Sequence, residues 1–384
     1  MQFELTEEQK MVQQLAAEFA QKELPYEKVR EWDANKVFPE EVVKKLGELG
    51  FMGVAIPPEY GGAGFDTISY VLAMIEIAKY DPGTAVIMSV NNSLVCDPLN
   101  KFGTEEQKKK YLTPLASGKI LGCFALSEPE AGSDAAEQRT TAVKDGNYYV
   151  LNGVKNFITN GPQADVAIVF AMTDKSKRHH GISAFIVEAD TPGFKITHVE
   201  DKMGIRTSGT AEITLEDVRV PAENMLGKEG EGFKVAMVTL DGGRIGIAAQ
   251  AVGIAEGAFE EAIKFAQERV AFGQNIINFQ AIQWMLADMH ARIEAAKLLT
   301  LKAAYLKDKG VRHTKESAVA KMYASETAVW VTNRAVQIHG GYGYIKDYKV
   351  EQLYRDAKIT EIYEGTNEIQ RLVIANQLRK EYQI

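Results

Sequence analysis

Cysteine is almost absent from this chain of 384 residues and occurs only as Cys96 and Cys123. The two are far apart, and neither forms a C-x-x-C pair or a cluster with histidine. The sequence therefore supports neither a structural zinc site nor a redox dithiol, and it fits a reducing compartment. The neighbours His179 and His180 lie in a basic, polar stretch, which favours a surface loop over a metal site. We expect no metal ion in this protein.

The chain also lacks long basic and long apolar runs. It has 44 basic and 52 acidic residues and a net charge of -8, so we expect no nucleic-acid partner. No apolar stretch approaches the length that spans a membrane. Residues 1–8 are acidic and favour the start of a helix, unlike a signal or transit peptide. These features predict a soluble cytoplasmic protein without membrane insertion, and a mature organellar form would share them.

Three common motifs of nucleotide-binding and hydrolytic enzymes are missing. No G-x-G-x-x-G follows a predicted strand, and neither G-x-x-x-x-G-K-S/T nor G-x-S-x-G occurs. These absences count against a nicotinamide-binding Rossmann unit, a P-loop enzyme and an α/β-hydrolase. With 46% hydrophobic residues, the chain is still long enough for two or three domains with cores of their own.

Helix signals dominate residues 1–118. Two capping boxes, Thr6 to Gln9 and Thr104 to Gln107, begin predicted helices. Apolar residues recur at helical spacing between them. We predict an N-terminal α-helical domain over 1–118.

The spacing of apolar residues changes near residue 119. Short β-branched or alternating stretches at 165–172, 181–187 and 212–216 predict strands, and turn residues separate them. We predict a β domain over 119–228.

From about residue 230 the pattern is helical again. Helices are predicted from Arg244 toward Phe265, from Gln280 toward Leu306 and from Lys315 toward Ile338. Long helices joined by short loops indicate an antiparallel bundle over 229–384. The predicted fold class is α+β multidomain, in the order helical, β, helical.

The segment 362–368 holds the strongest candidate for acid–base chemistry. Glu364 stands between an aromatic residue and Gly365, and a carboxylate beside glycine can project into a cleft where the backbone approaches a ligand. In an apolar, dry cleft its pKa would rise, and Glu364 would become a usable base near neutral pH. Taken alone, a glutamate before glycine is more often a solvated helix end.

Two stretches in the β domain could bind a polar ligand. Small and hydroxyl-bearing residues at 124–134 could cradle a ring or a phosphate, and the alternative is a plain loop. The aromatic residue in 152–161 could pack against a flat ring, and the alternative is a core phenylalanine.

Two stretches in the helical bundle have similar alternatives. Asp241 and Arg244, ahead of a long helix, could bind an adenine edge and a phosphate, or form a local ion pair at a helix start. The glycines of 337–344 could approach a pyrophosphate, or cap a helix that ends at Gly340. His339 is expected to be packed or capping rather than an acid–base residue.

Five motifs occur together in one order: S-E-P-x-A-G-S-D at 127–134, N-F-I-T-N-G at 156–161, R-x-x-F-G at 269–273, Q-I-H-G-G at 337–341 and Y-E-G-T-N-E at 363–368. In this combination the chain closely resembles the acyl-CoA dehydrogenase family, and within it the short-chain, butyryl-CoA type of bacteria. The resemblance covers essentially all residues. It implies an N-terminal α-helical domain, a middle β-barrel and a C-terminal four-helix bundle, with FAD bound between the last two in a homotetramer.

The resemblance also implies roles for individual residues. The FAD-binding residues would be Phe124, Leu126, Ser127, Ser133, Phe157, Thr159, Arg269, Phe272, Gln280, Gln337, Gly341, Thr366 and Glu368, of which Arg269 to Gly341 would reach the FAD of a neighbouring subunit. The substrate-binding residues would be Ser133, Asp241, Arg244 and Gly365. Ser127 stands where threonine is commoner in the family, and Phe157 where tryptophan is frequent. The hydroxyl group and the aromatic face are kept.

By the same resemblance, the protein is an FAD-dependent enzyme that oxidises a short-chain acyl-CoA to a trans-2-enoyl-CoA. Glu364 would remove the α-proton, the β-hydride would pass to flavin N5, and an electron-transferring flavoprotein would accept the electrons. Gly243 occupies the position from which isovaleryl and long-chain members supply their base, which leaves Glu364.

The acyl group stays open. Ala85 stands where glutaryl-CoA members carry an arginine, which disfavours a dicarboxylate substrate. A branched or alicyclic acyl group, such as cyclohexanecarboxyl, is an alternative to a linear one. A non-catalytic flavin-binding component of an electron-transfer complex is an alternative of another class.

Overall fold

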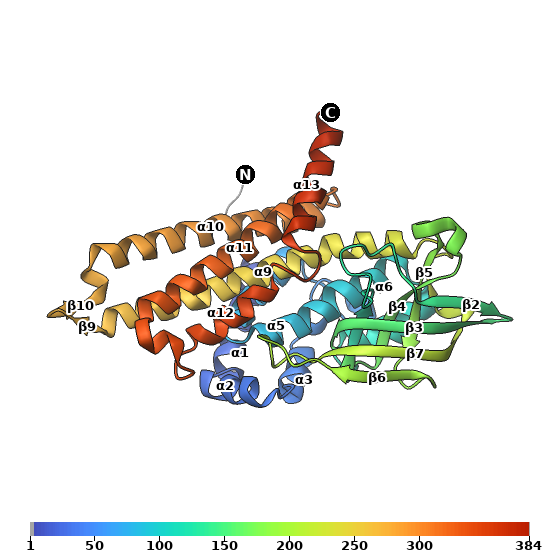
Figure 1. Ribbon diagram of the computed structural model, residues 1–384, viewed down its shortest axis with the longest axis horizontal. Helices are drawn as coiled ribbons and strands as arrows, with labels where there is room; N and C mark the ends of the chain where they lie inside the picture. Colours follow the sequence, from blue (N-terminus) through green and yellow to red (C-terminus); the bar gives the residue numbers. More distant parts are fainter. Residues whose placement is uncertain (1–3, 384) are drawn as a thin grey trace.

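The chain folds into a helical part, a β-sheet part and a second helical part (Figure 1). The structure is a computed structural model and describes residues 4–383. The predicted fold class and its order, helical, β, helical, are confirmed. The long helices α9, α10 and α11 extend toward one end of the molecule, and the sheet forms the other end (Figure 1).

Local capping signals begin the N-terminal helices as predicted. At α1, Thr6 Oγ1 accepts from the backbone N–H of Gln9 at 3.2 Å, and Gln9 Oε1 accepts from the N–H of Thr6 at 3.0 Å. The second capping box, Thr104 to Gln107, begins α7 in the same way. The helices of this part are α1 (Glu7–Glu23), α2 (Tyr26–Asn35), α3 (Glu40–Glu48), α4 (Thr67–Ala78), α5 (Pro82–Ser89), α6 (Asp97–Phe102), α7 (Glu105–Gln107) and α8 (Thr113–Ala116).

A buried π-helical segment, η3 (Val90–Cys96), joins α5 to α6. The side chains of Asn91 and Asn92 bond backbone groups of neighbouring segments, including the carbonyl of Met52 at 2.9 Å and the N–H of Val54 at 2.8 Å. Segments of π-helix are rare and concentrate at functional sites.

The middle part is an eight-stranded sheet with the order β6-β7-β3-β2-β4-β5-β8, and β1 pairs with β4. Pairing is antiparallel except for β1 and β2 against β4. The strands are β1 (Gly122–Ala125), β2 (Thr141–Asp145), β3 (Tyr148–Thr159), β4 (Val166–Met172), β5 (Ile182–Glu188), β6 (Phe194–Val199), β7 (Thr210–Pro221) and β8 (Met225–Leu226). The three predicted strands correspond to β4, β5 and part of β7.

Alternate residues of β4 face two different cores. Val166, Ile168 and Phe170 pack with apolar side chains of the helical parts. Ala167 and Val169 face a second core that also contains side chains of β2, β3 and β7. Because strands from distant positions in the sheet meet in this second core, the sheet curls around it, as expected for the predicted β-barrel.

The C-terminal part is a bundle of long helices. Its elements are α9 (Gly232–Glu268), the hairpin strands β9 (Val270–Ala271) and β10 (Gln274–Asn275), α10 (Gln280–Asp308), α11 (Thr314–His339), α12 (Val350–Ile359) and α13 (Asn367–Glu381). The helix predicted to start near Arg244 starts at Gly232 instead. The prediction that Asp241 and Arg244 stand ahead of this helix was therefore wrong, because Gly242 and Gly243 lie inside α9, where neighbouring side chains occupy the space beside them.

Two histidine predictions are confirmed. The α11 helix ends at His339 with Gly340 as its cap, and the buried His339 ring bonds the carbonyl of Ala335 at 2.8 Å and stacks on Phe265. His179 and His180 lie exposed in a 3-10 segment.

The described residues contain neither a candidate metal site nor a candidate membrane-spanning helix. Over residues 4–383, no cluster of His, Cys, Asp or Glu has a composition suited to a metal ion. In the same range, no helix combines the length and apolar character needed to cross a membrane.

Candidate active site

Glu364 lies in the short segment that joins α12 to α13. Its backbone has a positive φ of 53°, which is unusual for a residue other than glycine, and Gly365 follows at 91°. Gln370 holds this segment by donating to the carbonyls of Glu364 at 3.2 Å and Gly365 at 2.8 Å. The strained turn directs the carboxyl group inward, so Glu364 is not the solvated helix end that its sequence alone favoured.

The carboxyl group of Glu364 lies against the bare face of α9 at Gly243. Oε2 of Glu364 is buried and has no hydrogen-bond partner among the described residues. A Cβ atom added at Gly243 would overlap this oxygen and would lie 2.8 Å from Cδ2 of Leu94. Gly243 therefore makes room for the glutamate, and only a residue without a side chain fits there.

Burial raises the pKa of Glu364 to about 8, and the nearby cations Lys321 and Arg244 act in the opposite direction. In the described part of the chain, neither cation forms an ion pair with Glu364. Arg244 is paired instead with Asp241, at 2.7 Å, and Asp241 also accepts from Thr314 at 2.6 Å. The carboxylate is thus free to accept a proton in a poorly hydrated site that contains compensating positive charge.

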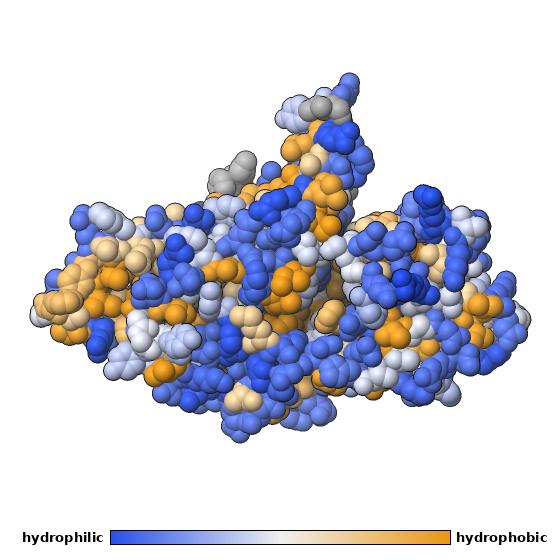
Figure 2. Space-filling model, viewed as in Figure 1, coloured by the Kyte–Doolittle hydropathy of each residue, from blue (hydrophilic) through white to orange (hydrophobic). Residues whose placement is uncertain are grey.

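A cleft of about 570 Å³ opens beside Asp241. Its lining includes charged and polar residues from α6, α9, α10 and the loop before α11: Asp97, Lys101, Asp241, Lys307, Arg312 and His313. On the face shown in Figure 2, the surface has a hollow of its own between the helical bundle and the sheet, near the segment that joins α12 to α13.

The predicted residues of the β part lie on two neighbouring segments, which are the end of β1 with the loop after it and the C-terminal end of β3. Phe124 and Leu126 are buried, and Ser127 is half-buried. The backbone carbonyl of Ser127 accepts from the N–H of Asn156 at 2.9 Å, which joins the first segment to β3. In β3, Phe157 has a positive φ of 58° and is 65% exposed. A large aromatic ring held open to solvent beside hydroxyl groups is suited to cover a flat, polar ligand.

Four further predicted FAD-binding residues are Ser133, Thr159, Thr366 and Glu368. Ser133 is exposed on the loop after β1, and Thr159 ends β3. Thr366 caps α13 by accepting from the N–H of Ile369, and Glu368 is exposed in the first turn of that helix.

A buried ion pair that motif analysis missed supports these segments. The ammonium group of Lys155, which is fully buried, lies 2.8 Å from Oε1 of Glu128 and also donates to the carbonyl of Leu126 at 3.2 Å. Glu128 in turn accepts from the backbone N–H groups of Arg139 and Thr140. The available sequence signal was a lysine at an inward position of a strand, which needs a buried partner.

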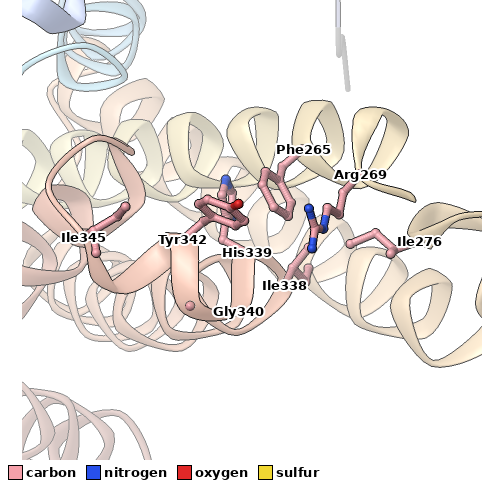
Figure 3. Close-up of a pocket in the computed structure, with 9 residues that line it drawn as sticks. Phe265, Arg269, Ile276, Ile338, His339, Gly340, Tyr342 and Ile345 are labelled. Atoms are coloured by element: carbon pink, nitrogen blue, oxygen red, sulfur yellow. The ribbon is translucent and has the colours of Figure 1, made fainter. Parts of the chain in front are cut away.

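The predicted FAD residues of the helical bundle gather elsewhere. Arg269 and Gly341 line a pocket of about 430 Å³ at the end of α9 and α11, together with Phe265, His339 and Tyr342 (Figure 3). The guanidinium group of Arg269 lies 5.4 Å from the centre of the Tyr342 ring. The remaining predicted residues of this group, Phe272, Gln280 and Gln337, are exposed, and Phe272 is 95% exposed.

Within one chain, the FAD-binding residues predicted in the β part lie far from those predicted in the helical bundle. The hairpin β9–β10 lies at one end of the molecule and the sheet lies at the other (Figure 1). Glu364, Gly365, Asp241 and Arg244 are brought together, on α9 and the segment before α13.

Three family models match successive parts of the chain. They are the N-terminal domain of acyl-CoA dehydrogenase at residues 6–119, its middle domain at 123–218 and its C-terminal domain at 230–379. The chain belongs to the acyl-CoA dehydrogenase family. Among its relatives, the short-chain specific acyl-CoA dehydrogenase of Clostridium acetobutylicum is 54% identical over 379 residues, which covers 98% of this chain and 100% of that protein.

Solved structures of acyl-CoA dehydrogenases and related complexes agree with the fold. Butyryl-CoA dehydrogenase from Megasphaera elsdenii superposes with a TM-score of 0.97 at 52% identity, covering 98% of this chain and 100% of that one. A chain from work on the electron transferring flavoprotein of Acidaminococcus fermentans has the same TM-score at 55% identity, covering 98% of this chain and 99% of that one. The family resemblance found in the motifs is confirmed.

Proposed function

We propose that this acyl-CoA dehydrogenase oxidises a short-chain acyl-CoA to the trans-2-enoyl-CoA, with Glu364 as the base. The reaction breaks the C–H bond at the α-carbon and passes its proton to the carboxylate of Glu364. The hydrogen at the β-carbon leaves with its electron pair, and a double bond forms between the two carbons. When bound, FAD accepts that hydride.

The observation that carries this proposal is the state of the Glu364 carboxyl group. Its Oε2 atom is buried and has no hydrogen-bond partner among residues 4–383, and its pKa is raised to about 8. A carboxylate in such surroundings is a stronger base than one in water, and a base with a pKa near the working pH is effective in proton abstraction. Its backbone N–H lies in the same strained turn, where it could hold the thioester oxygen as negative charge develops.

The residues of the β part fit a flavin. The exposed ring of Phe157 and the hydroxyl groups of Ser127, Ser133 and Thr159 combine an aromatic face with hydrogen-bond donors, which suits a flat ring with polar edges. The pocket around Arg269 and Gly341 provides a cation and a backbone without side chains, which suits a pyrophosphate. Because these groups lie at opposite ends of one chain, a neighbouring subunit of a homotetramer would supply the second group.

The cleft beside Asp241 suits the CoA part of the substrate. Lys101, Lys307 and Arg312 line it. Lys101 and Lys307 share Asp97 as their partner, so the three cations carry an excess of positive charge over that carboxylate that could hold the phosphate groups of CoA. The thioester would then reach Glu364 past Arg244, which follows Asp241 on α9.

Side chains of α4 and α5 restrict the space along α9 beyond Glu364. A Cβ at Gly246 would lie 2.5 Å from Oη of Tyr70 and 2.6 Å from Oγ of Ser89, and Tyr70 bonds Ser89 at 3.0 Å. Gly246 is one helical turn beyond Gly243, about 4.5 Å along the axis. An acyl chain that follows α9 would meet these hydroxyl groups after a few carbon atoms, which supports a short acyl group.

An electron-transferring flavoprotein is the proposed electron acceptor. The similarity to a chain studied with the electron transferring flavoprotein of Acidaminococcus fermentans supports this choice. The cytoplasmic location inferred from the sequence stays a prediction.

Anaerobic bleaching of the flavin tests the function. Purified protein should be yellow, release FAD on denaturation and lose its flavin colour with butyryl-CoA faster than with octanoyl-CoA or cyclohexanecarboxyl-CoA. The E364Q variant should keep its FAD and lose about two to four powers of ten in the rate of flavin reduction. E326Q, a change at a glutamate of α11 that pairs with Arg371, is the matched control and should stay near the wild-type rate. Flavin reduction by E364Q at the wild-type rate would rule out Glu364 as the base.

A further inference from the structure

Lys321 is a buried cation beneath the segment that carries Glu364. It lies on α11 within an alanine-rich stretch, and its side chain has no exposed surface. Its ammonium group donates to the carbonyl of Gly365 at 2.9 Å and to Oδ1 of Asn367 at 3.0 Å. A lysine is almost never fully buried unless it has a specific partner, so the partners of Lys321 indicate its role.

The two contacts of Lys321 lie on either side of Thr366, directly after Glu364. Gly365 has a positive φ, and its carbonyl also accepts from Gln370 at 2.8 Å. Asn367 is fixed from the other side by Ser325, which bonds the same amide group at 3.0 and 3.1 Å. Lys321 thus joins α11 to both ends of the Gly365–Asn367 segment. Neutral side chains could satisfy these acceptors, so hydrogen bonding alone does not require a charged one.

We propose that Lys321 is a positioning residue for Glu364, which anchors the turn that carries the base and, when protonated, favours the ionised form of its carboxylate. The inference rests on the proposed function of Glu364. Lys321 takes no part in the proton transfer: the substrate's α-proton goes to Glu364, which becomes a neutral carboxylic acid.

Each of the two groups favours the charged form of the other. Burial lowers the pKa of Lys321 to about 7, and Glu364, Glu361 and Glu368 act in the opposite direction. Burial raises the pKa of Glu364, and Lys321 lowers it ahead of Arg244. The charged and titratable groups around the pair come from α4, α9, α11, α13 and the segment at Glu364: Tyr70, Arg244, Lys321, Glu361, Tyr363, Glu364 and Glu368.

The two cations near Glu364, Lys321 and Arg244, differ in their partners, because only Arg244 forms an ion pair with a carboxylate among the described residues. Arg244 is already paired with Asp241, so much of its charge is balanced there. The described residues give Lys321 only a carbonyl and an amide oxygen as acceptors. Its uncompensated charge is therefore available to Glu364 without a direct ion pair, which would block the proton acceptor.

The test measures how the rate of flavin reduction with saturating butyryl-CoA depends on pH. K321M removes the charge and the donor, whereas K321Q removes the charge and keeps a donor. In both variants the acidic limb of the profile should move upward by about one pH unit, so that the rate near neutral pH falls about tenfold. K321Q should approach the wild-type rate at high pH, and K321M should reach a lower plateau because the turn is less well held.

Two further variants separate charge from structure. K321R keeps the charge, and its acidic limb should stay at the wild-type position. S325A removes a neutral contact of Asn367, so it should lower the rate without moving the profile. If K321M does not retain FAD, the comparison of K321Q with K321R decides the question alone.

The outcomes distinguish this inference from the proposed function. An inactive E364Q together with wild-type acidic limbs in K321Q and K321M would overturn the role of Lys321 alone. A fully active E364Q would overturn the role of Glu364 and, with it, that of Lys321. An equal loss of rate at every pH in K321Q would show a purely structural role and would also overturn the charge part of the inference.

Discussion

Adding one methyl group at Gly243 should disable the enzyme without unfolding it. A Cβ at this position overlaps Oε2 of Glu364 and lies 2.9 Å from the carboxyl carbon Cδ. Ordinary contacts between carbon atoms are about 3.5 Å or longer. In G243A the carboxyl group must therefore shift by on the order of 1 Å, and a misplacement of that size can cost about 10²-fold in rate.

The stability of G243A should hold or rise. The atoms that the new methyl group meets are the ends of two side chains, those of Glu364 and Leu94, which can rotate away. Alanine is also about 1 kcal/mol better than glycine inside a helix. Loss of activity with an unchanged or higher Tm would therefore be the signature of a displaced base rather than of a damaged fold.

Gly242 provides a matched control on the same helix. A Cβ there would lie 3.2 Å from Nζ of Lys307 and 3.6 Å from Oδ2 of Asp97, away from Glu364. G242A should gain the same helix propensity and keep most of its activity. The assay is stopped-flow reduction of the flavin by butyryl-CoA under anaerobic conditions, with FAD content and Tm measured in parallel. A G243A rate within about twofold of wild type would refute the claim that the glycine makes room for the base, since a 1 Å shift should cost far more.

Two other predictions concern pH and the flavin loops. With the pKa of Glu364 at about 8, the rate at low acyl-CoA concentration should rise as the pH rises through about 8. A carboxyl group whose pKa is raised by folding destabilises the folded state progressively as the pH rises above the pKa of the unfolded chain. E364Q should therefore raise Tm more at about pH 9 than at about pH 5. Equal Tm shifts at both pH values would contradict the raised pKa of Glu364. K155M leaves Glu128 buried without its cation, which typically costs about 3–5 kcal/mol, so Tm and FAD retention after dialysis should fall. K144M, at an exposed lysine of β2, should change neither, and retention of FAD by K155M at the level of K144M would show that the pair does not support the loops.

The parts of the fold that local signals control were predictable from the sequence. Both capping boxes start helices because donor and acceptor lie three residues apart on the same segment. The helices from Gln280 and Lys315 were predicted from their helical pattern, and the strands β4 and β5 from short apolar, β-branched stretches. The start of α9 was missed because Gly242 and Gly243 resemble a turn, and only the side chains packed against them explain their place in a helix.

The candidate site was also predictable from the sequence only in part. Motifs identified Glu364 and Gly243 but could not show that the carboxyl group of one fills the space beside the other, since that contact joins segments more than a hundred residues apart. Lys155 and Lys321 were missed for a related reason. A lysine in a strand or a helix usually marks the exposed face, and its burial depends on an acceptor supplied by another element, here Glu128 and Gly365.

The long helix α9 has a consequence for how this protein can be divided. It has 37 residues, so it is about 55 Å long. Along its length it packs against α4 and α5 of the first helical part, β5 of the sheet and α10 and α11 of the bundle. A cut between the sheet and α9 would leave each fragment with an unfilled apolar surface. The family's three sequence domains should therefore unfold together and exchange their core amide hydrogens in one step, and recombining them between relatives should succeed only when α9 and the surfaces it covers are exchanged as one piece.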